Sequence, residues 1–583
     1  MPNLAPADWL IVLIFFFFAI SAGFSLKAAI GVSKDYLQGG RALPAWLCGL
    51  ALAAAGLGLQ APVTFGAMGA HYGFESVPFA LMGGIPAMLF VGIFMMPQYY
   101  GSNARTVPDY LGKRFDKKTR ILSAVLFLVS TLTGIAFSLH AMARIFAALR
   151  LFDEPLRALK LNAEASSLVA MAIPAALVLA YVLLGGLPGA IYNQAMQLFV
   201  MAAGFLPVVF LGLKQLGGWN GLKSASATAG STYFHLASGG HNGPAAFAFA
   251  AGIGLLFGMG FWCADFRVLQ IAMAAKGTKS AQQVPIIAAV VWLVLPLALI
   301  LPGVMALGMP TPHTTISVHS DNVAIYHDIT VVPPADEAGQ GLVPAVIDQA
   351  SGKPKQRADG HNRLEYALAA PNMLLHFLPM GLLGLGISAL LACMMSGIAA
   401  GMSAFNAVFT FDIYQAHIRK TAEERHLMLV SRWAAGTAML AAYGVAWAVL
   451  HWHLRLDRMV GVLAWFSAPL LVIILLGMFC KRTTGHGAFA GLVAGVVCTT
   501  IVSHHHLNRL GHGLLAVVCG VGASLLIGIA VSLFTKPRSD KDLADTVYSL
   551  RKRKVVKTVW WKRIEAMAGA ILIAGIAMTL IFA

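Results

Sequence analysis

Charged residues are scarce in this chain. Only 11% of its 583 residues are Asp, Glu, Lys or Arg, while 58% are hydrophobic and the mean hydropathy is +0.75. Soluble proteins carry about 25% charged residues, so this composition excludes a soluble globular protein of this length. Apolar windows of about 20 residues recur along the chain, and they predict an all-α polytopic membrane protein with about 14 transmembrane helices.

Acidic residues are scarcer than basic residues. The chain has 24 Asp and Glu against 41 Lys and Arg, which gives a net charge of +17. The basic residues concentrate in every second loop between the predicted spans, as the positive-inside rule describes. This placement argues against nucleic-acid binding and for contact with membrane lipids, above all in the basic run at residues 551–554. It predicts an integral protein of the bacterial cytoplasmic (inner) membrane with both termini on the outer side.

Catalytic and metal-binding patterns are also lacking. The sequence contains no Walker loop, no nucleophile elbow and no Cys/His spacing typical of a metal site, so we do not expect an enzyme. The six cysteines fall in or at the ends of predicted spans, where they serve as small apolar residues. The histidines at 504–506 and 512 have no Cys or carboxylate companion and are typical of a solvated loop. No cofactor is expected beyond a coupling ion.

The chain does contain a membrane span that is interrupted at its centre. Residues 45–72 begin with good helix formers and then reach Gly56, Gly58, Gln60 and Pro62 near mid-depth. The bilayer core offers no water to unpaired backbone groups, so a span breaks only where protein covers it or where it lines a cavity. Secondary transporters place their solute and ion sites at such discontinuous helices. A glycine-rich packing seam between helices would give a similar pattern.

A second span, at residues 245–272, has a matching glycine series: Gly252, Gly254, Gly258 and Gly260. Paired interruptions indicate an inverted-repeat transporter, so we expect a second break at residues 254–260. The first repeat would cover 45–213 and the second 245–480, with an extra N-terminal helix and inner loop in 1–44 and three more helices in 481–583. The long outer segments 214–244 and 309–371 offer a surface to other membrane proteins.

Several short motifs follow one another between about residue 34 and residue 497. They are D35-Y-L-Q-G-G-R-A-L-P-A-W-L-C-G, G185-G-L between the predicted spans 165–184 and 189–213, A274-A-K, F409-T-F-D-I-Y and G477-M-F-C-K-R-T-T-G-H-G-A-F-A-G-L-V-A-G. Together they resemble the sodium:solute symporter family. The resemblance implies a LeuT-like fold with a 5+5 inverted repeat and transport by alternating access, usually coupled to sodium.

The resemblance also implies a place for sodium. In the sugar-transporting branch of the family, main-chain carbonyls of the broken helix and of a later helix hold the ion together with two adjacent serine hydroxyls. The corresponding positions here are Ala54, Leu57 and Cys393 for the carbonyls, Ser396 and Gly397 for the hydroxyls, and Gln194 where that branch has an aspartate. One hydroxyl and one charge are lost, while a hard cation prefers about six oxygens. We therefore expect a sodium site that is weak or absent.

The positions that match the polar sugar ligands of that branch have apolar residues or glycine here: Gly56, Ala61, Met82, Trp292 and Gly461. Gln60 is the polar side chain that stays beside the break. A sugar cannot be desolvated without replacement hydrogen bonds, so we expect a mostly apolar pocket. The main-chain N–H groups at a helix break suit a carboxylate, which favours a small monocarboxylate or an apolar amino acid over a sugar.

A few ionisable residues lie at membrane depth, where they are costly and usually functional. Residues two apart do not share a helix face, so we expect Asp265 and Arg267 to have separate partners, or to lie near a wetted inner mouth. Asp265 is the candidate for proton coupling. His140 and Arg144 share one helix face, and Asp412 is expected to bind a helix terminus or a loop.

These features predict a secondary-active transporter of a small organic solute with sodium coupling weakened or lost. The alternative is a non-transporting subunit or sensor of a larger membrane assembly, which would have kept the fold and lost the site. Uptake of a solute by the purified protein would distinguish the two.

Overall fold

The computed structural model describes residues 5–28, 30–58, 61–148, 163–228, 244–309, 339–346, 353–356, 362–451, 456–505, 512–550 and 563–582. Gln60, the histidine at 506, the basic run at 551–554 and parts of the outer segments 214–244 and 309–371 lie outside these ranges. Within them the protein is almost entirely helical, with only isolated β-bridges such as the one between Leu43 and Ala275.

Long apolar helices form the body of the protein. They are α1 (Pro6–Lys27), α3 (Ala45–Gly56), α4 (Ala61–Tyr72), α5 (Ser76–Phe90), η3 (Val91–Met95), α6 (Met96–Gly101), α8 (Lys117–Ala148), α10 (Ala163–Gln215), α13 (Pro244–Ala264), α14 (Phe266–Met273), α15 (Gly277–Trp292), α16 (Leu295–Ala306), α18 (Leu383–Val408), η5 (Phe409–Ile418), α19 (Glu424–His451), α20 (Leu456–Phe479), α21 (Gly485–His505), α22 (His512–Phe534) and α24 (Ile564–Ile581). Shorter elements connect them: α2 (Ser33–Gln38), η1 (Gly39–Arg41), η2 (Gly73–Glu75), α7 (Val107–Arg114), α11 (Trp219–Thr228), η4 (Tyr366–Leu368), α17 (Ala369–Phe377), α23 (Asp540–Leu543) and η6 (Tyr548–Leu550).

In the described part of the chain, ten helical segments are long and apolar enough to cross a membrane, or eleven if α13 and α14 count as one bent span. The predicted number of about 14 is therefore not confirmed. One reason is that the predicted spans 165–184 and 189–213 form the single element α10. Another is that α3, one half of an interrupted span, is too short to qualify alone.

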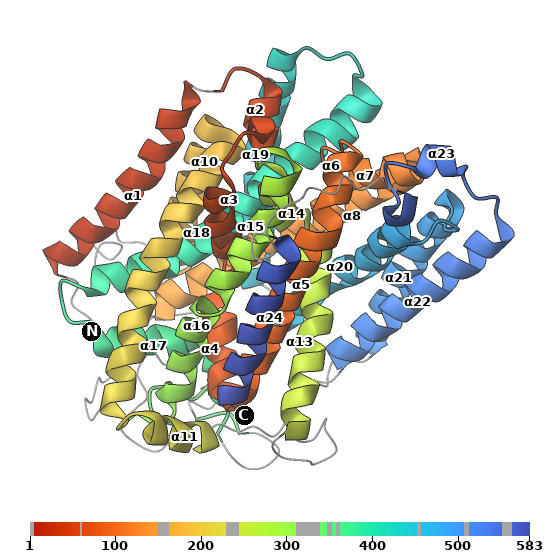
Figure 1. Cartoon of the computed structure of the whole chain (residues 1–583). Coiled ribbons are helices and arrows are strands. Elements are labelled where there is room, and N and C mark those ends of the chain that lie inside the picture. Colours follow the sequence, from red (N-terminus) through yellow and green to blue (C-terminus); the bar gives the residue numbers. More distant parts are fainter. Residues whose placement is uncertain are drawn as a thin grey trace.

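α18 and η5 lie at the centre of the molecule. In the candidate span Leu383–Ile418, 94% of the most apolar window is buried inside the protein, against 28% in α22 and 22% in both α1 and α24. Figure 1 agrees with these buried fractions, because α18 lies among other helices and the α21–α22 pair lies at the periphery. The outer helices therefore present apolar side chains to lipid, while α18 packs against protein on all sides.

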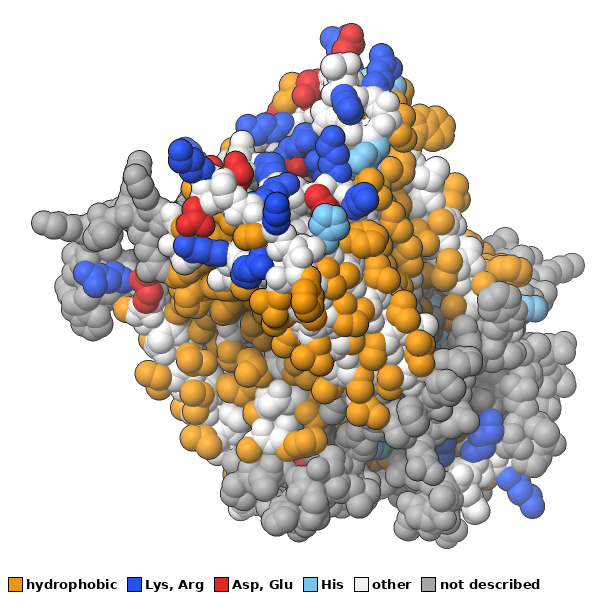
Figure 2. All heavy atoms as spheres, turned by 90° about the vertical axis from the view of Figure 1, so that its right-hand side faces the viewer, with side chains coloured by type: hydrophobic (Ala, Val, Ile, Leu, Met, Phe, Trp, Pro, Cys, Tyr) orange, Lys and Arg blue, Asp and Glu red, His pale blue; other side chains and the backbone are white. Residues whose placement is uncertain are grey.

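Charge separates the two ends of the helices. Figure 2 shows Lys and Arg gathered at one end, above a broad belt of hydrophobic side chains. The short helices α2, α7 and α23 lie at this basic end, and both termini lie at the opposite end (Figure 1). Such an asymmetry is what the predicted orientation requires, with the basic end in the cytoplasm.

The predicted interruption of the span at 45–72 is confirmed. α3 ends at Gly56 and α4 begins at Ala61. Leu57 closes α3, because its N–H donates to Ala53 O at 3.0 Å and its backbone is still helical. Leu57 is fully buried, so protein covers the end of α3, as the bilayer requires.

The predicted second break at residues 254–260 is wrong. α13 is continuous through these residues, and the chain bends by 55° only at Asp265, before α14. Two of the glycines, Gly254 and Gly258, serve close packing against α5 instead: a Cβ on Gly258 would lie 1.6 Å from Gly83 O, and one on Gly254 would lie 2.3 Å from Phe79 O. Small residues let two membrane helices approach backbone to backbone. The packing seam thus accounts for these glycines, while a broken helix still exists in this span.

α10 changes direction at Gly186, where φ is +54° and ψ is −148°. Glycine adopts this conformation at little cost, and a Cβ at this position would lie 2.4 Å from Tyr36 O. Tyr36 of α2 packs into the kink, and its hydroxyl donates to Val182 O at 2.9 Å. The kink thereby attaches α2, at the basic end, to the middle of α10.

Candidate functional site

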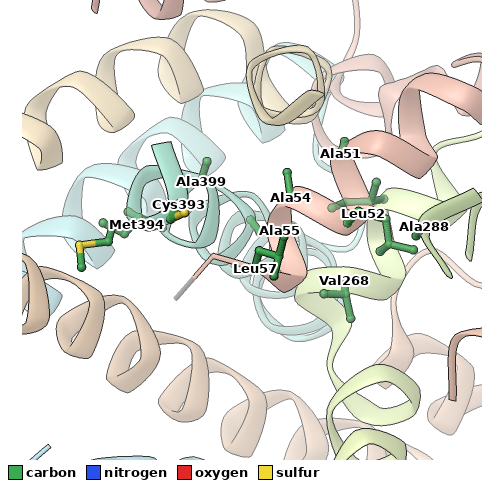
Figure 3. Packing of buried hydrophobic residues seen from close by; sticks show 14 of the residues in the cluster. Ala51, Leu52, Ala54, Ala55, Leu57, Val268, Ala288, Cys393, Met394 and Ala399 are labelled. Carbon is green, nitrogen blue, oxygen red and sulfur yellow. The ribbon is translucent and has the colours of Figure 1, made fainter. Parts of the chain in front are cut away.

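The end of α3 meets α18 directly at the first helix break. A Cβ on Gly58 would lie 2.4 Å from the nitrogen of Gly397 and 2.5 Å from its Cα. Figure 3 shows Ala54 and Leu57 of α3 together with Cys393 of α18, and all three belong to one buried cluster. The structure therefore brings the predicted ion-site residues of these two helices together.

Gln194 of α10 joins the same place. Its Nε2 donates to the main-chain oxygen of Ser396 at 3.1 Å, and both residues are fully buried. Gln194 Oε1 and Ser396 Oγ have no hydrogen-bonding partner among the described residues. Buried polar atoms are nearly always paired, so these two oxygens are candidate ligands. These two oxygens alone are fewer than the five or six that a hard cation prefers.

Two tryptophans occupy the space beside the break. The rings of Trp262 on α13 and Trp292 on α15 are perpendicular, with centroids 5.0 Å apart. A Cβ on Gly56 would lie 2.2 Å from Cη2 of Trp262 and 3.1 Å from Cζ3 of Trp292. Trp292 is fixed by its Nε1, which donates to Ala80 O at 3.1 Å, and Phe65 packs edge-on against its ring. The wall of the candidate pocket is therefore aromatic.

Among the other predicted pocket residues, the structure describes the side chain of Met82, which does not join this wall. The Cε of Met82 lies 3.6 Å from the Cβ position of Gly575, so Met82 faces α24. Ala61 begins α4 and Gly461 lies in α20, but their side-chain surroundings, like those of Gln60, are outside the described residues.

An apolar cavity with room for about one water molecule lies next to Trp262. Its other lining residues include Leu52, Met88, Val268, Leu269 and Pro285. A cavity without polar partners stays dry. The space between α3 and α14, which belong to the two different broken helices, is thus closely packed and apolar.

Asp265 and Arg267 bind each other, so the expectation of separate partners is wrong. Asp265 is the N-cap of α14, and its extended backbone lies outside the helix, where the rule for residues two apart does not apply. Its Oδ1 accepts from Arg267 N at 2.9 Å, and Arg267 Nε donates to Oδ2 at 2.7 Å. Both residues are buried, with exposed fractions of 7% and 5%, which also contradicts a position at a wetted mouth.

His140 and Arg144 lie on α8 as expected but do not act as a pair. Arg144 Nη2 lies 3.9 Å from Glu365 Oε2, just before η4. His140 is buried, and neither ring nitrogen has a partner in the described part of the chain.

Asp412 binds a loop and a helix start, as predicted. It lies in η5 at the basic end, is fully buried, and accepts from Thr106 Oγ1 at 2.5 Å and from Arg120 Nε at 2.8 Å. Arg120 of α8 also lies 3.1 Å from Asp109 of α7. These contacts hold α7, α8 and η5 together.

Asp109 is the second acid of this network. Burial acts to raise the pKa of Asp109, but the N–H of Arg105 and the positive charges of Arg120, Lys113 and Arg105 outweigh it, so its pKa lies below the ordinary value of 3.8. The carboxylate is therefore the favoured form in the folded protein. The sequence showed these residues only as loop charges, and no local pattern indicated that they pair.

Trp262 was not predicted as a pocket residue, nor Asp265 as the residue at the second break, although the sequence contains a signal for both. Trp262 and Asp265 fall in the tetrapeptide W-C-A-D. An Asp that follows a long apolar run and precedes a helix is an N-cap signal. If Asp265 is taken as an N-cap, the tetrapeptide predicts the break at Asp265 and places Trp262 about one helical turn before the break.

A family model for the sodium:solute symporter family matches residues 36–495 of this chain. Among curated proteins, the sodium/myo-inositol cotransporter 2 of Sus scrofa is 27% identical over 518 residues, which cover 85% of this chain and 69% of that protein. The sodium/glucose cotransporter of Vibrio parahaemolyticus is 24% identical and covers 80% of this chain and 78% of its own length.

Among solved structures, a Na+-coupled sialic acid symporter in a substrate-bound outward-open state is similar, with a TM-score of 0.69 and 16% identity. The match covers 91% of this chain and 99% of that one. At this identity the likeness concerns the fold, and it agrees with the LeuT-like architecture that the two broken helices indicate.

Proposed function

This chain belongs to the sodium:solute symporter family and is a secondary membrane transporter, and we propose that it moves a small organic solute with sodium coupling that is weak or absent. The observation that carries the proposal is the composition of the ion-site cluster. Among the described residues, it offers one buried hydroxyl, on Ser396, and the neutral amide of Gln194, and the side-chain oxygen of each has no hydrogen-bonding partner there. A neutral and partial oxygen set binds a cation weakly.

The test is uptake by the purified protein in liposomes with imposed ion gradients. We expect uptake that changes little when the sodium gradient is removed, and little further change in a Ser396→Ala variant. Ser388→Ala is the matched control, because Ser388 is buried on the same helix but its hydroxyl donates to Gly384 O at 2.8 Å. Strong sodium-driven uptake that Ser396→Ala abolishes and Ser388→Ala preserves would overturn the proposal.

The same vesicles test a proton gradient. Asp265 was the acid expected to couple protons, and its pairing with Arg267 supports a structural role for it. Proton-driven uptake that is lost in Asp265→Asn, while the variant keeps its melting temperature, would assign it a coupling role.

For the solute, we propose a small monocarboxylate or an apolar amino acid. The wall formed by Trp262, Trp292 and Phe65 offers apolar area and few hydrogen-bonding groups, and such sites bind mainly through buried surface. The names of the relatives suggest glucose or myo-inositol instead, so both sugars should be tested as competitors of uptake in the same liposomes. Tight, saturable binding of either sugar by calorimetry would contradict the monocarboxylate proposal. A protein that takes up no solute and co-purifies with other membrane proteins would favour the non-transporting subunit.

A further inference from the structure

A small polar cavity lies at the basic end, away from the ion-site cluster and the tryptophan wall. It has room for about one water-sized particle and is lined by Leu37, Gln38, Arg41, Arg105, Phe266 and Gln270, among others. These residues come from α2, η1, the segment before α7, and α14. The cavity therefore lies where α14, the second half of a broken helix, meets two other parts of the chain. One is α2 with η1, which precede α3, and the other is the segment just before α7.

The two arginines of this cavity are held by neutral acceptors. Arg41 Nη1 donates to Asn103 Oδ1 at 3.0 Å, and its Nη2 donates to Ala104 O. Arg105 Nη1 donates to Gln415 Oε1 at 2.8 Å. Among the described residues, neither guanidinium forms an ion pair with a carboxylate. Two positive charges thus line one cavity, and no carboxylate in the described part of the chain lies within ion-pair distance of either.

The nearest acid cannot supply that counter-charge alone. Asp109 is engaged by Lys113 at 3.3 Å and by Arg120 at 3.1 Å. Burial lowers the pKa of Arg41, and the charge of Arg105 lowers it further, while Tyr100 and Asp109 act in the opposite direction. The two guanidinium groups line the same cavity and carry like charges, so an anion bound in this cavity would relieve their repulsion.

Gln38 adds a free donor. It is only 8% exposed, and its Nε2 is buried without a hydrogen-bonding partner among the described residues. Gln270 closes the cavity from α14, with its Nε2 donating to Ala400 O at 2.9 Å. The Oε1 of Gln270 is also unpartnered and would accept from a water molecule, so water is the competing occupant.

We propose that this cavity binds one small monovalent anion of about the size of chloride, held by Arg41, Arg105 and the side-chain N–H of Gln38. Charge-assisted hydrogen bonds of this kind are stronger than neutral ones. A carboxylate head group has the same chemistry, and the assay separates the two sources. The site is independent of the solute proposed above.

The anion would stabilise the closed arrangement of the basic end. The same elements are already tied there by main-chain bonds: Leu43 N donates to Ala274 O at 3.2 Å, and Lys276 N donates to Leu43 O at 2.9 Å. Tyr100 adds a hydroxyl bond to Met273 O at 3.0 Å. An anion between Arg41, Arg105 and Gln38 adds a further link next to α14, so it must leave, or its contacts must rearrange, when this end opens.

The experiment measures the melting temperature of the full-length purified protein in detergent at constant ionic strength. Chloride, bromide, formate and acetate replace gluconate step by step. We expect chloride and bromide to raise the melting temperature by about 2 °C with saturation, because a ligand of the folded state stabilises it by mass action. A larger rise with formate and acetate than with halides would identify carboxylate as the ligand class. Equal melting temperatures in all salts would leave only water in the cavity and overturn the proposal.

Variants locate the effect. Gln38→Leu and Arg105→Gln should each remove at least half of the halide shift. Arg482→Gln is the matched control, because Arg482 also donates to main-chain oxygens at the basic end, Thr535 O and Leu533 O, but away from this cavity. A halide shift of the same size in Gln38→Leu, Arg105→Gln and Arg482→Gln would overturn the site. If Arg105→Gln does not fold, the halide shift of Gln38→Leu alone tests the site, because this substitution removes one amide and leaves the charge of the cavity unchanged. Bromide bound at this cavity in an anomalous diffraction map is the second, independent readout.

Discussion

A single methyl group at Gly58 tests the contact between the first helix break and α18. Its Cβ would lie 2.4 Å from the backbone nitrogen of Gly397, and a backbone atom cannot move aside as a flexible side chain can. We expect Gly58→Ala to destabilise the folded protein by about 3 kcal/mol and to lower transport.

Gly436→Ala is the control, because a Cβ on Gly436 in α19 meets nothing within 4 Å. That variant should be neutral or slightly stabilising. A melting temperature of Gly58→Ala equal to that of Gly436→Ala would contradict the close approach.

The ion pair of Asp265 and Arg267 offers a second test with single residues. Asp265→Asn leaves a buried guanidinium without its charge partner, and breaking a buried pair in this way costs about 3–5 kcal/mol. We expect a large fall in melting temperature for Asp265→Asn. Adding Arg267→Met removes the unpaired charge and should restore part of the loss, which a double-mutant cycle measures as coupling. Additive effects of the two substitutions would show that the pair does not stabilise α14.

At the scale of the element, α13 shows that a series of glycines alone does not distinguish a helix break from close helix packing. Gly258 packs against Gly83 of α5, whereas a Cβ on Gly252 of the same helix meets nothing within 4 Å. We expect Gly258→Ala to force α13 and α5 apart and to destabilise the protein by about 3 kcal/mol. Gly252→Ala is a control in the same helix and should be neutral. Equal thermal stability of the two variants would contradict the packing seam.

The two broken helices could be predicted to different degrees. For α3 and α4, two glycines, an amide and a proline fall together, and proline cannot continue a helix from the preceding turn; the break was placed correctly at 56–60. For α13, glycines without a proline indicated a break in the correct span but at the wrong residues. The wrong placement arose because small residues serve helix packing as well as helix ends. The N-cap at Asp265 was the more specific signal.

The positions of the candidate ion site were predictable through the resemblance to the sodium:solute symporter family, which implies them residue by residue. Ser396 and Gly397 on α18, Leu57 on α3 and Gln194 on α10 were expected together, and the structure brings them together. The partners of Asp265 were not predictable from helical spacing, because the residue lies outside the helix. The aromatic wall was not predictable either, because the contact of Trp262 with Gly56 joins residues about 200 positions apart in the sequence.

α7 gives a prediction on pH. The pKa of Asp109 is lowered below 3.8 in the folded protein. The stabilisation by its carboxylate is therefore present above the ordinary value of 3.8 and is lost as the pH falls from there through the lowered pKa of the folded protein. We expect Asp109→Asn to lower the melting temperature at pH 7. The difference from the unmodified protein should shrink as the pH falls from about 5 to about 3. A difference that is constant over this range would show that the charge of Asp109 does not stabilise α7.

For the whole molecule, the separation of charge sets the orientation in the membrane. The basic residues gather at the end that carries α2, α7 and α23 (Figures 1 and 2). The opposite end is built differently: Trp219 of α11 stacks on Phe74 and contacts Phe582, next to the end of α24. Basic loops are retained in the cytoplasm during insertion, so α11 and both termini should face outward.

Cysteine labelling tests this orientation in intact cells. In a variant whose six native cysteines are replaced, one new cysteine is placed at each end, Lys118→Cys in α8 or Asn220→Cys in α11, both at exposed positions. A membrane-impermeant maleimide should label Asn220→Cys in intact cells and Lys118→Cys only after the membrane is opened. The opposite pattern would place the basic end outside. It would also mean that the positive-inside rule fails for this chain despite its net charge of +17.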